Sequence, residues 1–584
     1  MERRVLIAVV LSFLVLYGYQ ALFVPTPPAP DTTQQSAAPS PAASATPATP
    51  GAPTPQGSPA VVAAPAPSAP AATVGDTAER RITVETATVE AELSNRGGRV
   101  VSWRLKEYRD AEGMPVDLVP SGIAADQPTP FSLRVDDTEL TERINTALYR
   151  VSGDTNGRVD ARTTPGTLVF EFEDESGLRV RKEFVIDPRN YQVTFSAQVN
   201  NGDQALNPAV QWGPGLGDVG ATSSGGSFFT GNYVQPPQAI YHRDGDVERI
   251  DAGSLSEQPT HEGQFRFAGV DDHYFIAAAL NPGQAKAEFR AVTLPGTADT
   301  QRQLISQTFT FPQAPQNVKF FYGPKQFDLL RSTDGEFVRA INFGIFGWLA
   351  VPLLGALNWI YGYVANYGWA IVLLTIGINI AIFPLRHKSV VSMRKMQALQ
   401  PQMKAIQERY AGLKVTDPAK QKMNAEIMNL YREKGVNPAS GCIPMLLTMP
   451  VLFAFYSLLT QSIELRGAGF IGWITDLSQP DPYFVIPAIM VGTMFWQQKI
   501  TPSTMDPAQQ KVMLMMPLIF GVMLAWTASG TALYWSVSNI WAIGQQYLTN
   551  RLIGPPQAQP ARAATERQLK KAGAGRSSGA EKRP

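Results

Sequence analysis

The stretch WAIVLLTIGINIAIFPLRHK, residues 369–388, decides the architecture of this 584-residue chain. Its first seventeen residues carry no charge, and a helix of that length nearly spans the ~30 Å hydrocarbon core of a membrane. Residues 386–434, which follow, contain eleven Lys or Arg against four Asp or Glu. Because Lys and Arg concentrate in cytoplasmic loops, this stretch predicts one membrane crossing that ends in the cytoplasm.

The residues before this stretch decide how often the chain crosses here. The uncharged run from residue 340 to residue 385 is long enough for two spans. Two crossings would place the basic segment outside the cytoplasm, against the usual distribution of Lys and Arg. We therefore expect an interfacial amphipathic helix rich in Trp and Tyr at residues 340–366, and a span at residues 367–385.

The N-terminal region predicts a second membrane attachment. Arg3 and Arg4 precede an apolar run at residues 5–24, which fits either a cleaved signal peptide or a retained anchor. The run is long for a signal peptide, so we expect an anchor at residues 1–24. Cys442 is the only cysteine, which excludes both an intramolecular disulfide and an N-terminal lipid anchor. Residues 25–78, with fourteen prolines up to residue 72, predict an unfolded linker.

Residues 79–325 follow a different pattern, typical of an all-β sandwich. Apolar and polar residues alternate in Ile82-Thr83-Val84-Glu85 and again in Phe170-Glu171-Phe172-Glu173. Gly97-Gly98 and Asp187-Pro188-Arg189-Asn190 mark turns between such runs. The region shows no long helical period. Because it follows the first anchor, we expect it to lie outside the cytoplasm.

The basic segment at residues 386–440 predicts a helical hairpin. Pro401 should bend or break its first helix, Asp417-Pro418 should begin the second, and Gly435 should end it. Apolar residues recur at spacings of three and four in both halves. They are Met393, Met396, Leu399, Met403, Ile406 and Tyr410, then Met423, Ile427, Leu430 and Tyr431.

The rest of the chain predicts four more spans, for six in all. They are expected at residues 441–463, 482–498, 512–528 and 530–552, joined by loops at residues 464–481 and 499–511. The loop at residues 464–481 has one basic and three acidic residues, whereas the tail at residues 553–584 is basic. These charges fit a topology with both termini in the cytoplasm, because Lys and Arg concentrate on that side of the membrane. The net charge of +1 gives no general indication of nucleic-acid binding.

Several short motifs in this region together resemble the YidC/Oxa family of membrane protein insertases, in the Gram-negative layout that carries a large periplasmic domain. Each motif alone is weak, but their order and spacing are specific. They are Phe383-Pro384-Leu385, Ser392-Met393, Asn437-Pro438-Ala439-Ser440-Gly441-Cys442-Ile443-Pro444, Met449-Pro450, Met516-Pro517, Ser529-Gly530-Thr531-Ala532-Leu533-Tyr534-Trp535-Ser536-Val537-Ser538-Asn539 and Gln545-Gln546.

The resemblance implies an inner-membrane insertase and chaperone that inserts, folds and assembles membrane proteins, both independently of the Sec translocon and with it. It implies a five-helix core with a hydrophilic groove open to the cytoplasm and to lipid. Such a process needs no cofactor and no covalent catalysis. The expected partners are nascent membrane proteins, the Sec translocon and lipid. The basic hairpin and tail could also meet the ribosome or the signal-recognition receptor.

The resemblance also directs attention to the first core span. The family places a basic residue four positions before the aromatic residue of Phe383-Pro384-Leu385, where this chain has Asn379. Arg386 could supply positive potential instead, or Asn379 could simply bond a neighbouring helix. The other candidates for groove contact with substrate are Gln497, Trp535, Ser457 and Thr460. Ser and Thr in spans often bond their own helix backbone instead.

Two other classes of function compete with this interpretation. A transporter or channel often contains internal repeats, and none is visible. A periplasmic enzyme or sugar sensor would need a convergent acid/base set in residues 79–322, and none can be identified. His261-Glu262 and Asp271-Asp272-His273 superficially suggest metal ligands, but surface loops explain them better than a metal site does.

Overall fold

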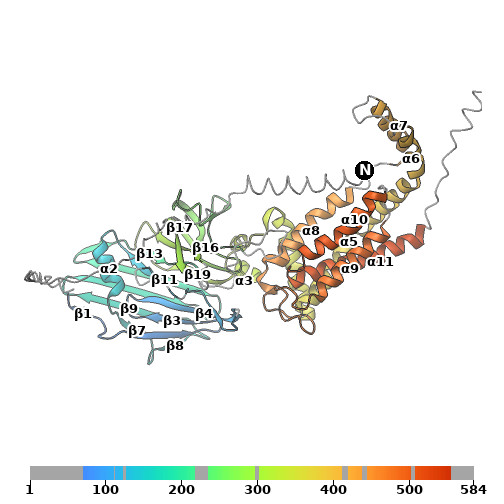
Figure 1. Cartoon of the computed structure of the whole chain (residues 1–584). Coiled ribbons are helices and arrows are strands. Elements are labelled where there is room, and N and C mark those ends of the chain that lie inside the picture. Colours follow the sequence, from blue (N-terminus) through green and yellow to red (C-terminus); the bar gives the residue numbers. More distant parts are fainter. Residues whose placement is uncertain are drawn as a thin grey trace, which may run out of the picture.

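The computed structural model describes residues 70–110, 112–120, 122, 127–216, 235–295, 301–410, 419–436, 443–501 and 507–553. A β-rich domain lies beside a helical bundle, and helices α6 and α7 project from the opposite end of that bundle (Figure 1). We call the two parts the β-domain and the bundle, and the two ends of the bundle its domain end and its hairpin end. The predicted anchor at residues 1–24 lies outside the described residues.

The described β-domain contains a 14-stranded and a 5-stranded sheet. The main path of the large sheet is β1-β9-β10-β11-β19-β17-β16-β14-β15, and the small sheet is β5-β4-β3-β2-β8. The strands are β1 (Ala72–Val74), β2 (Arg81–Glu85), β3 (Val89–Ser94), β4 (Arg99–Arg109), β5 (Pro115–Asp117), β6 (Ser132–Arg134), β7 (Arg150–Ser152), β8 (Arg158–Asp160), β9 (Gly166–Asp174), β10 (Leu178–Ile186), β11 (Gln192–Asn201), β12 (Gln204–Leu206), β13 (Ala209–Trp212), β14 (Gln238–Arg243), β15 (Asp246–Asp251), β16 (Thr260–Asp271), β17 (Phe275–Pro295), β18 (Gln301–Thr310) and β19 (Val318–Pro324).

The alternating pattern predicted strands at β2 and β9 because it matches a sheet with one buried face. In β9, Leu168, Phe170 and Phe172 are buried, and the residues between them are partly exposed. The predicted turns are confirmed: Gly97 and Gly98 have φ of 74° and 53° between β3 and β4. Asp187 closes the turn between β10 and β11 by accepting from the backbone N–H groups of Arg189 and Asn190, both at 2.8 Å.

The β-domain also contains a short helix, α2 (Thr138–Thr146), with Asp137 accepting from the backbone N–H of Leu140 at its start. The linker also ends earlier than residue 78, since Ala72 and Val74 pair with β9 as strand β1. Strand pairing at a sheet edge depends on backbone groups and not on side chains. The Pro/Ala-rich composition therefore did not reveal strand β1.

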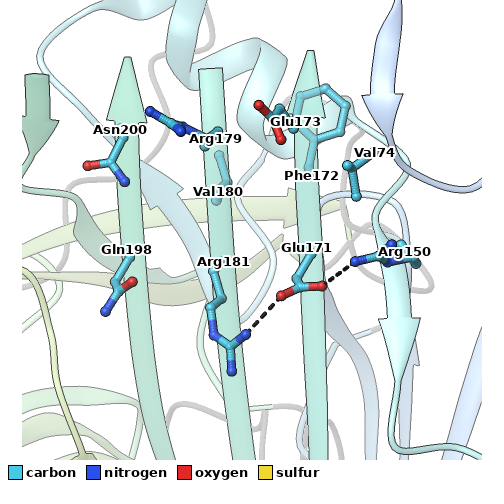
Figure 2. A pocket seen from close by; sticks show the side chains of 10 residues that line it. All are labelled: Val74, Arg150, Glu171, Phe172, Glu173, Arg179, Val180, Arg181, Gln198 and Asn200. Carbon is cyan, nitrogen blue, oxygen red and sulfur yellow. Dashed lines mark hydrogen bonds and ion pairs between the residues drawn. The ribbon is translucent and has the colours of Figure 1, made fainter. Parts of the chain in front are cut away.

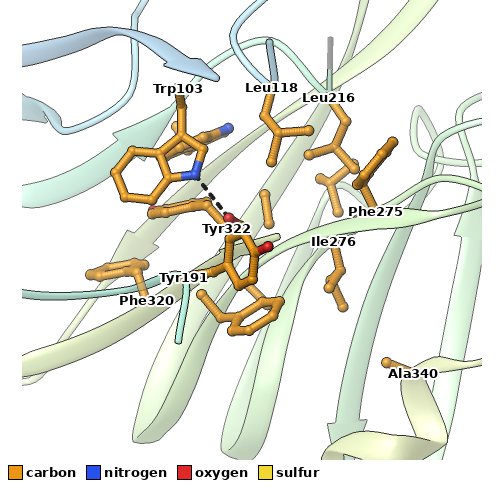
Figure 3. Close-up of a cluster of buried hydrophobic side chains, with 14 of the residues drawn as sticks. Trp103, Leu118, Tyr191, Leu216, Phe275, Ile276, Phe320, Tyr322 and Ala340 are labelled. Carbon is orange, nitrogen blue, oxygen red and sulfur yellow. Dashed lines mark hydrogen bonds between the residues drawn. The ribbon is translucent and has the colours of Figure 1, made fainter. Parts of the chain in front are cut away.

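Aromatic side chains join the two sheets in the core of the β-domain (Figure 3). The Trp103 indole of β4 donates to the backbone carbonyl of Tyr322 on β19 at 2.9 Å and meets the Tyr322 ring edge to face. Trp212 stacks on that ring at 3.5 Å. All three residues are buried. Because the small sheet contributes Trp103 and the large sheet contributes Tyr322, this cluster holds the two sheets together.

Helices make up most of the rest of the described chain. The helices are α3 (Phe327–Thr333), η2 (Phe337–Ala340), η3 (Gly344–Phe346), α4 (Gly347–Val364), α5 (Tyr367–Ala398), α6 (Gln400–Arg409), α7 (Ala419–Glu433), α8 (Ile443–Gln461), η5 (Ile463–Leu465), α9 (Val485–Ile500), α10 (Pro507–Met523) and α11 (Ser529–Ile553). Helix α10 starts before residue 512 and ends before residue 528, because residues 524–528 turn into α11.

Two helices in the described ranges are long and apolar enough to cross a membrane, Gly344–Val364 and Tyr367–Ala398. Length and composition therefore do not separate the expected interfacial helix at residues 340–366 from a spanning one. Helix α4 leaves Trp348 71%, Trp359 65% and Tyr363 74% exposed. Such aromatic side chains are typical of a membrane–water interface.

The hairpin forms as predicted, but α5 extends further than the expected span. Helix α5 continues past Pro384 to Ala398, and α6 then begins with Pro401 in its first turn. Tyr431 of α7 packs with Leu399 and donates to the Met403 sulfur at 3.0 Å. The two apolar stripes therefore meet. Gly435, with φ of 63°, follows the end of α7, whereas Asp417-Pro418 and Asn437-Pro438 lie outside the described residues.

Candidate functional site

A line of polar side chains runs along α5 inside the bundle. Thr375 is fully buried and Asn379 is 5% exposed. The Asn379 amide donates to the backbone carbonyl of Thr375 at 2.8 Å. Polar groups in a span are costly unless they face protein or water, and they often mark functional sites. The buried position of Asn379 therefore makes it a candidate for function as well as for packing.

Arg386 completes the polar environment of Asn379. Its guanidinium donates to the Asn379 side-chain oxygen at 3.2 Å. Arg386 lies seven residues further along α5, about 10 Å along the helix axis, so its side chain reaches back toward the middle of the helix. A positive charge therefore lies next to the uncharged residue at position 379.

Helices α9 and α11 contribute the neighbouring polar groups. The Asn539 amide of α11 donates to the Thr493 hydroxyl of α9 at 3.3 Å. Gln497, four residues after Thr493, lies on the same face of α9 and is half-buried. Trp535 is half-buried on α11, and its buried indole N–H has no acceptor among the described residues. Gln497 and Trp535 therefore belong to two helices that pack together, of which α11 also packs against α5.

Towards the hairpin end, α5 and α11 share further polar contacts that the sequence did not single out. His387 contacts the Thr549 hydroxyl at 3.4 Å, and Arg394 donates to the side chain of Asn550. Gln545 is 7% exposed, and its amide has no partner within the described chain. The four-residue spacing of Gln545 and Thr549 indicates a shared helix face, which could have identified this seam.

Ser457 and Thr460 lie elsewhere, at the domain end of α8. The Ser457 hydroxyl donates to the backbone carbonyl of Phe343 at 3.0 Å. The Thr460 hydroxyl donates to the carbonyl of Tyr456 in its own helix at 3.0 Å, which is the alternative expected for a Thr in a span. The structure therefore does not bring these two residues together with Asn379 and Arg386.

A hollow on the large sheet of the β-domain is lined by paired charges (Figure 2). Glu171 lies between two arginines and accepts from Arg181 at 2.8 Å and from Arg150 at 2.7 Å. A carboxylate held by two guanidinium groups is stabilised in its charged form. Glu171 is therefore poorly suited to exchange protons with a substrate.

The acidic and histidine motifs of the β-domain are also not surface loops, contrary to expectation. His261, Asp271 and His273 are 7%, 0% and 4% exposed. The Lys325 ammonium bonds Asp271 at 2.8 Å, and His261 contacts the Tyr241 hydroxyl at 3.1 Å. The described ranges contain no group of three residues that could hold a metal ion. These residues instead serve packing and the contact with the bundle.

Comparison with known proteins accounts for both parts of the chain. The family described as "60Kd inner membrane protein" matches residues 359–555, and the family "YidC periplasmic domain" matches residues 81–356. The β-domain is therefore a periplasmic domain of the YidC type, built as a β-sandwich. A crystal structure of an active YidC insertase is also similar at 18% identity, covering 81% of this chain and 95% of that chain, with a TM-score of 0.34.

Relatives match nearly the whole chain. The membrane protein insertase YidC of Maridesulfovibrio salexigens is 35% identical over 576 residues, covering 94% of this chain and 99% of the relative. The protein of the same name from Geobacter sulfurreducens is 37% identical over 580 residues, covering 96% of this chain and 100% of the relative. The chain therefore belongs to the YidC family of membrane protein insertases.

Proposed function

We propose that this protein inserts, folds and assembles inner-membrane proteins, acting both on its own and together with the Sec translocon. The observation that carries the mechanism is the contact in α5 between the buried Asn379 and the half-buried Arg386. Polar and charged side chains inside a membrane helix are costly, so their presence usually marks a functional site. Relatives that match nearly the whole chain are named membrane protein insertases.

The mechanism we propose uses a hydrophilic groove between α5, α9 and α11. Moving one charged residue into the centre of a membrane costs about 2.5–3.5 kcal/mol. A groove that is open to the cytoplasm and to lipid shortens the apolar path of a hydrophilic segment. Asn379, Arg386, Gln497 and Trp535 would contact this segment, while its apolar neighbours move into lipid. Ser457 and Thr460 would act at the domain end instead. No bond is made or broken, so no cofactor takes part.

The proposed topology has six spans with both termini in the cytoplasm. The hairpin of α6 and α7 then lies in the cytoplasm, where its basic residues could meet the ribosome, the signal-recognition receptor or anionic lipid. Helix α4 would lie at the outer interface, which suits its exposed Trp348, Trp359 and Tyr363. The segment at residues 1–24 would serve as the first anchor.

Photocrosslinking to a stalled nascent membrane protein tests the groove. A photoreactive residue at position 379, 497 or 535 should crosslink to the nascent chain. Leu373, which is 45% exposed on the outside of α5, provides the control position. We expect the three groove positions to crosslink several times more strongly than position 373. Equal yields at all four positions would contradict a groove at this place.

A further inference from the structure

The end of α8 is capped by a side chain from the β-domain. The last carbonyl groups of a helix have no partner within the helix, and one of these in α8 belongs to Thr460. The His273 ring donates from Nε2 to this carbonyl at 2.8 Å. Its Nδ1 accepts from the backbone N–H of Gln235 at 3.3 Å. Both ring nitrogens are therefore used, and the imidazole is fixed as the neutral Nε2–H form.

The bundle provides a cap to the β-domain side in return. Helix α3 starts at Phe327, and the preceding residue, Gln326, makes no side-chain capping hydrogen bond. Glu464, three residues after the end of α8, accepts from the backbone N–H of Phe327 through Oε1 at 2.9 Å. Each side therefore satisfies a backbone group that the other side leaves without a partner.

Buried charges hold the two caps in position. Lys325 and Asp271 form an ion pair at 2.8 Å, with 2% and 0% of their side chains exposed. The Lys325 ammonium also donates to the backbone carbonyl of Asp272 at 2.5 Å, directly before His273. The His273 ring thus projects from a turn that is fixed from within the β-domain.

Arg466 adds a third contact from the bundle. Its guanidinium donates to the backbone carbonyl of Arg109 at 2.9 Å. The same group lies 5.1 Å from the centre of the Tyr274 ring and 5.3 Å from that of Phe275. Cation–π contacts of this kind gain strength when they are removed from water. The contact thus reaches the end of β4 and the turn between β16 and β17.

The segment fixed by these contacts continues across the domain end of the bundle. We call residues 466–481 the outer loop. Asn366, just before α5, donates to the Phe470 carbonyl at 3.2 Å, and Ser529 of α11 donates to the Gln479 carbonyl at 2.7 Å. Asp481 accepts from the backbone of the first turn of α9 at 2.7 Å. The outer loop therefore joins the starts of three helices.

We propose that the β-domain is a fixed clamp on the bundle, which holds the end of α8 through the exchanged caps and so keeps the outer loop seated over α5, α9 and α11. This inference concerns how the two parts are joined and does not depend on the insertase function. It assigns His273, Glu464 and Arg466 as positioning residues.

The charges around each cap support a buried contact. Burial, together with the facing Lys325 and Arg466, lowers the pKa of His273 to about 4. Burial, with a contribution from Asp328, raises the pKa of Glu464 to about 7, while the hydrogen bond from Phe327 opposes this change. Both groups are thus held towards their neutral forms in mildly acidic solution.

Pulsed electron paramagnetic resonance on the full chain in lipid nanodiscs tests the clamp. Cys442 is replaced by Ser, and spin labels are attached at Ser152 of the β-domain and Thr475 of the outer loop, both exposed. The starting protein should give one narrow distance distribution. Removing both caps with His273→Phe and Glu464→Ala should broaden this distribution at least twofold. An unchanged width would overturn the proposal.

Matched variants separate capping from general damage. His261→Phe replaces another buried histidine that bonds within the β-domain, to Tyr241 and to the carbonyl of Gln258. Its distribution should stay narrow. Glu464→Gln keeps an oxygen acceptor and should also stay narrow. If the double variant loses the near-ultraviolet circular dichroism of the β-domain, Arg466→Gln decides, because its side chain belongs to the outer loop. Broadening supports the clamp, and an unchanged width overturns it.

Discussion

The Lys325–Asp271 ion pair can be broken by one substitution, Lys325→Met, which keeps the length of the side chain and removes its charge. Both side chains are almost fully buried, and their charged atoms lie 2.8 Å apart. After the substitution, the Asp271 carboxylate keeps the hydrogen bond from the Gln235 amide at 3.2 Å. We therefore expect the β-domain to lose stability, because a buried carboxylate is left without its counter-charge.

The size of this loss follows from the burial of the pair. Removing one partner of a buried ion pair costs about 3–5 kcal/mol in free energy of unfolding, because the remaining charge is left uncompensated.

Hydrogen–deuterium exchange of the full chain measures this loss in the β-domain alone. A loss of about 4 kcal/mol corresponds to roughly 1,000-fold faster exchange of protected amides in β17 and β19. Lys319→Met, an exposed lysine on β19, is the matched control and should change exchange less than about threefold. Equal exchange in the two variants at pH 7 would refute the reasoning.

Three further predictions concern pH, the core and the outer loop. In Glu464→Gln, docking should weaken as the pH falls from 6.5 to 4 because His273, with its pKa lowered to about 4 by burial, must then be protonated. In the unaltered protein, Glu464 contributes stability that is complete below pH 4.5 and is lost as the pH rises towards about 7. This trend opposes that of His273, which weakens docking as the pH falls, so the spin-label distance should change little between pH 4.5 and 6.5. Lys182→Met should destabilise the β-domain by about 3 kcal/mol or more, measured by exchange, because the buried ammonium donates to three backbone carbonyls. Gly368→Ala should cost about 1–3 kcal/mol and speed tryptic cleavage in the outer loop, since the new Cβ would lie 2.1 Å from the Phe470 ring.

Each of these predictions has an internal comparison. Gly377→Ala lies on the same helix as Gly368, but its Cβ would meet no atom within 4 Å, so cleavage should stay unchanged. Lys319→Met serves again as the exposed lysine for Lys182. For the pH series, His273→Gln should reverse the trend, because Glu464 alone then titrates and docking weakens as the pH rises from 4.5 to 7.

The regular elements could be predicted because their residues obey local rules. Alternation of apolar and polar residues predicted β2 and β9, and spacings of three and four predicted the matching faces of α6 and α7. Pro401 marked the break between α5 and α6, because proline has no backbone N–H to donate to the preceding turn of a helix. In each case the decisive information lies within a few residues of the element itself.

The contacts between distant segments could not be predicted in the same way. His273 and Thr460 are 187 positions apart, and no local pattern connects them. His273 follows a strand and sits among charged residues, so the sequence suggested a surface loop. Similarly, the sequence places Arg386 at the end of an apolar run, but only the fold shows that its side chain reaches back to Asn379.

Insertion of a small, Sec-independent membrane protein in cells depleted of this chain tests the central claim most directly. Insertion should fail after depletion and recover when the unaltered chain is supplied. Arg386→Ala should restore it less well than Asn379→Ala, because Arg386 carries the positive charge of the proposed groove. The opposite ranking would contradict the role given to Arg386, and normal insertion without the chain would contradict the proposed function itself.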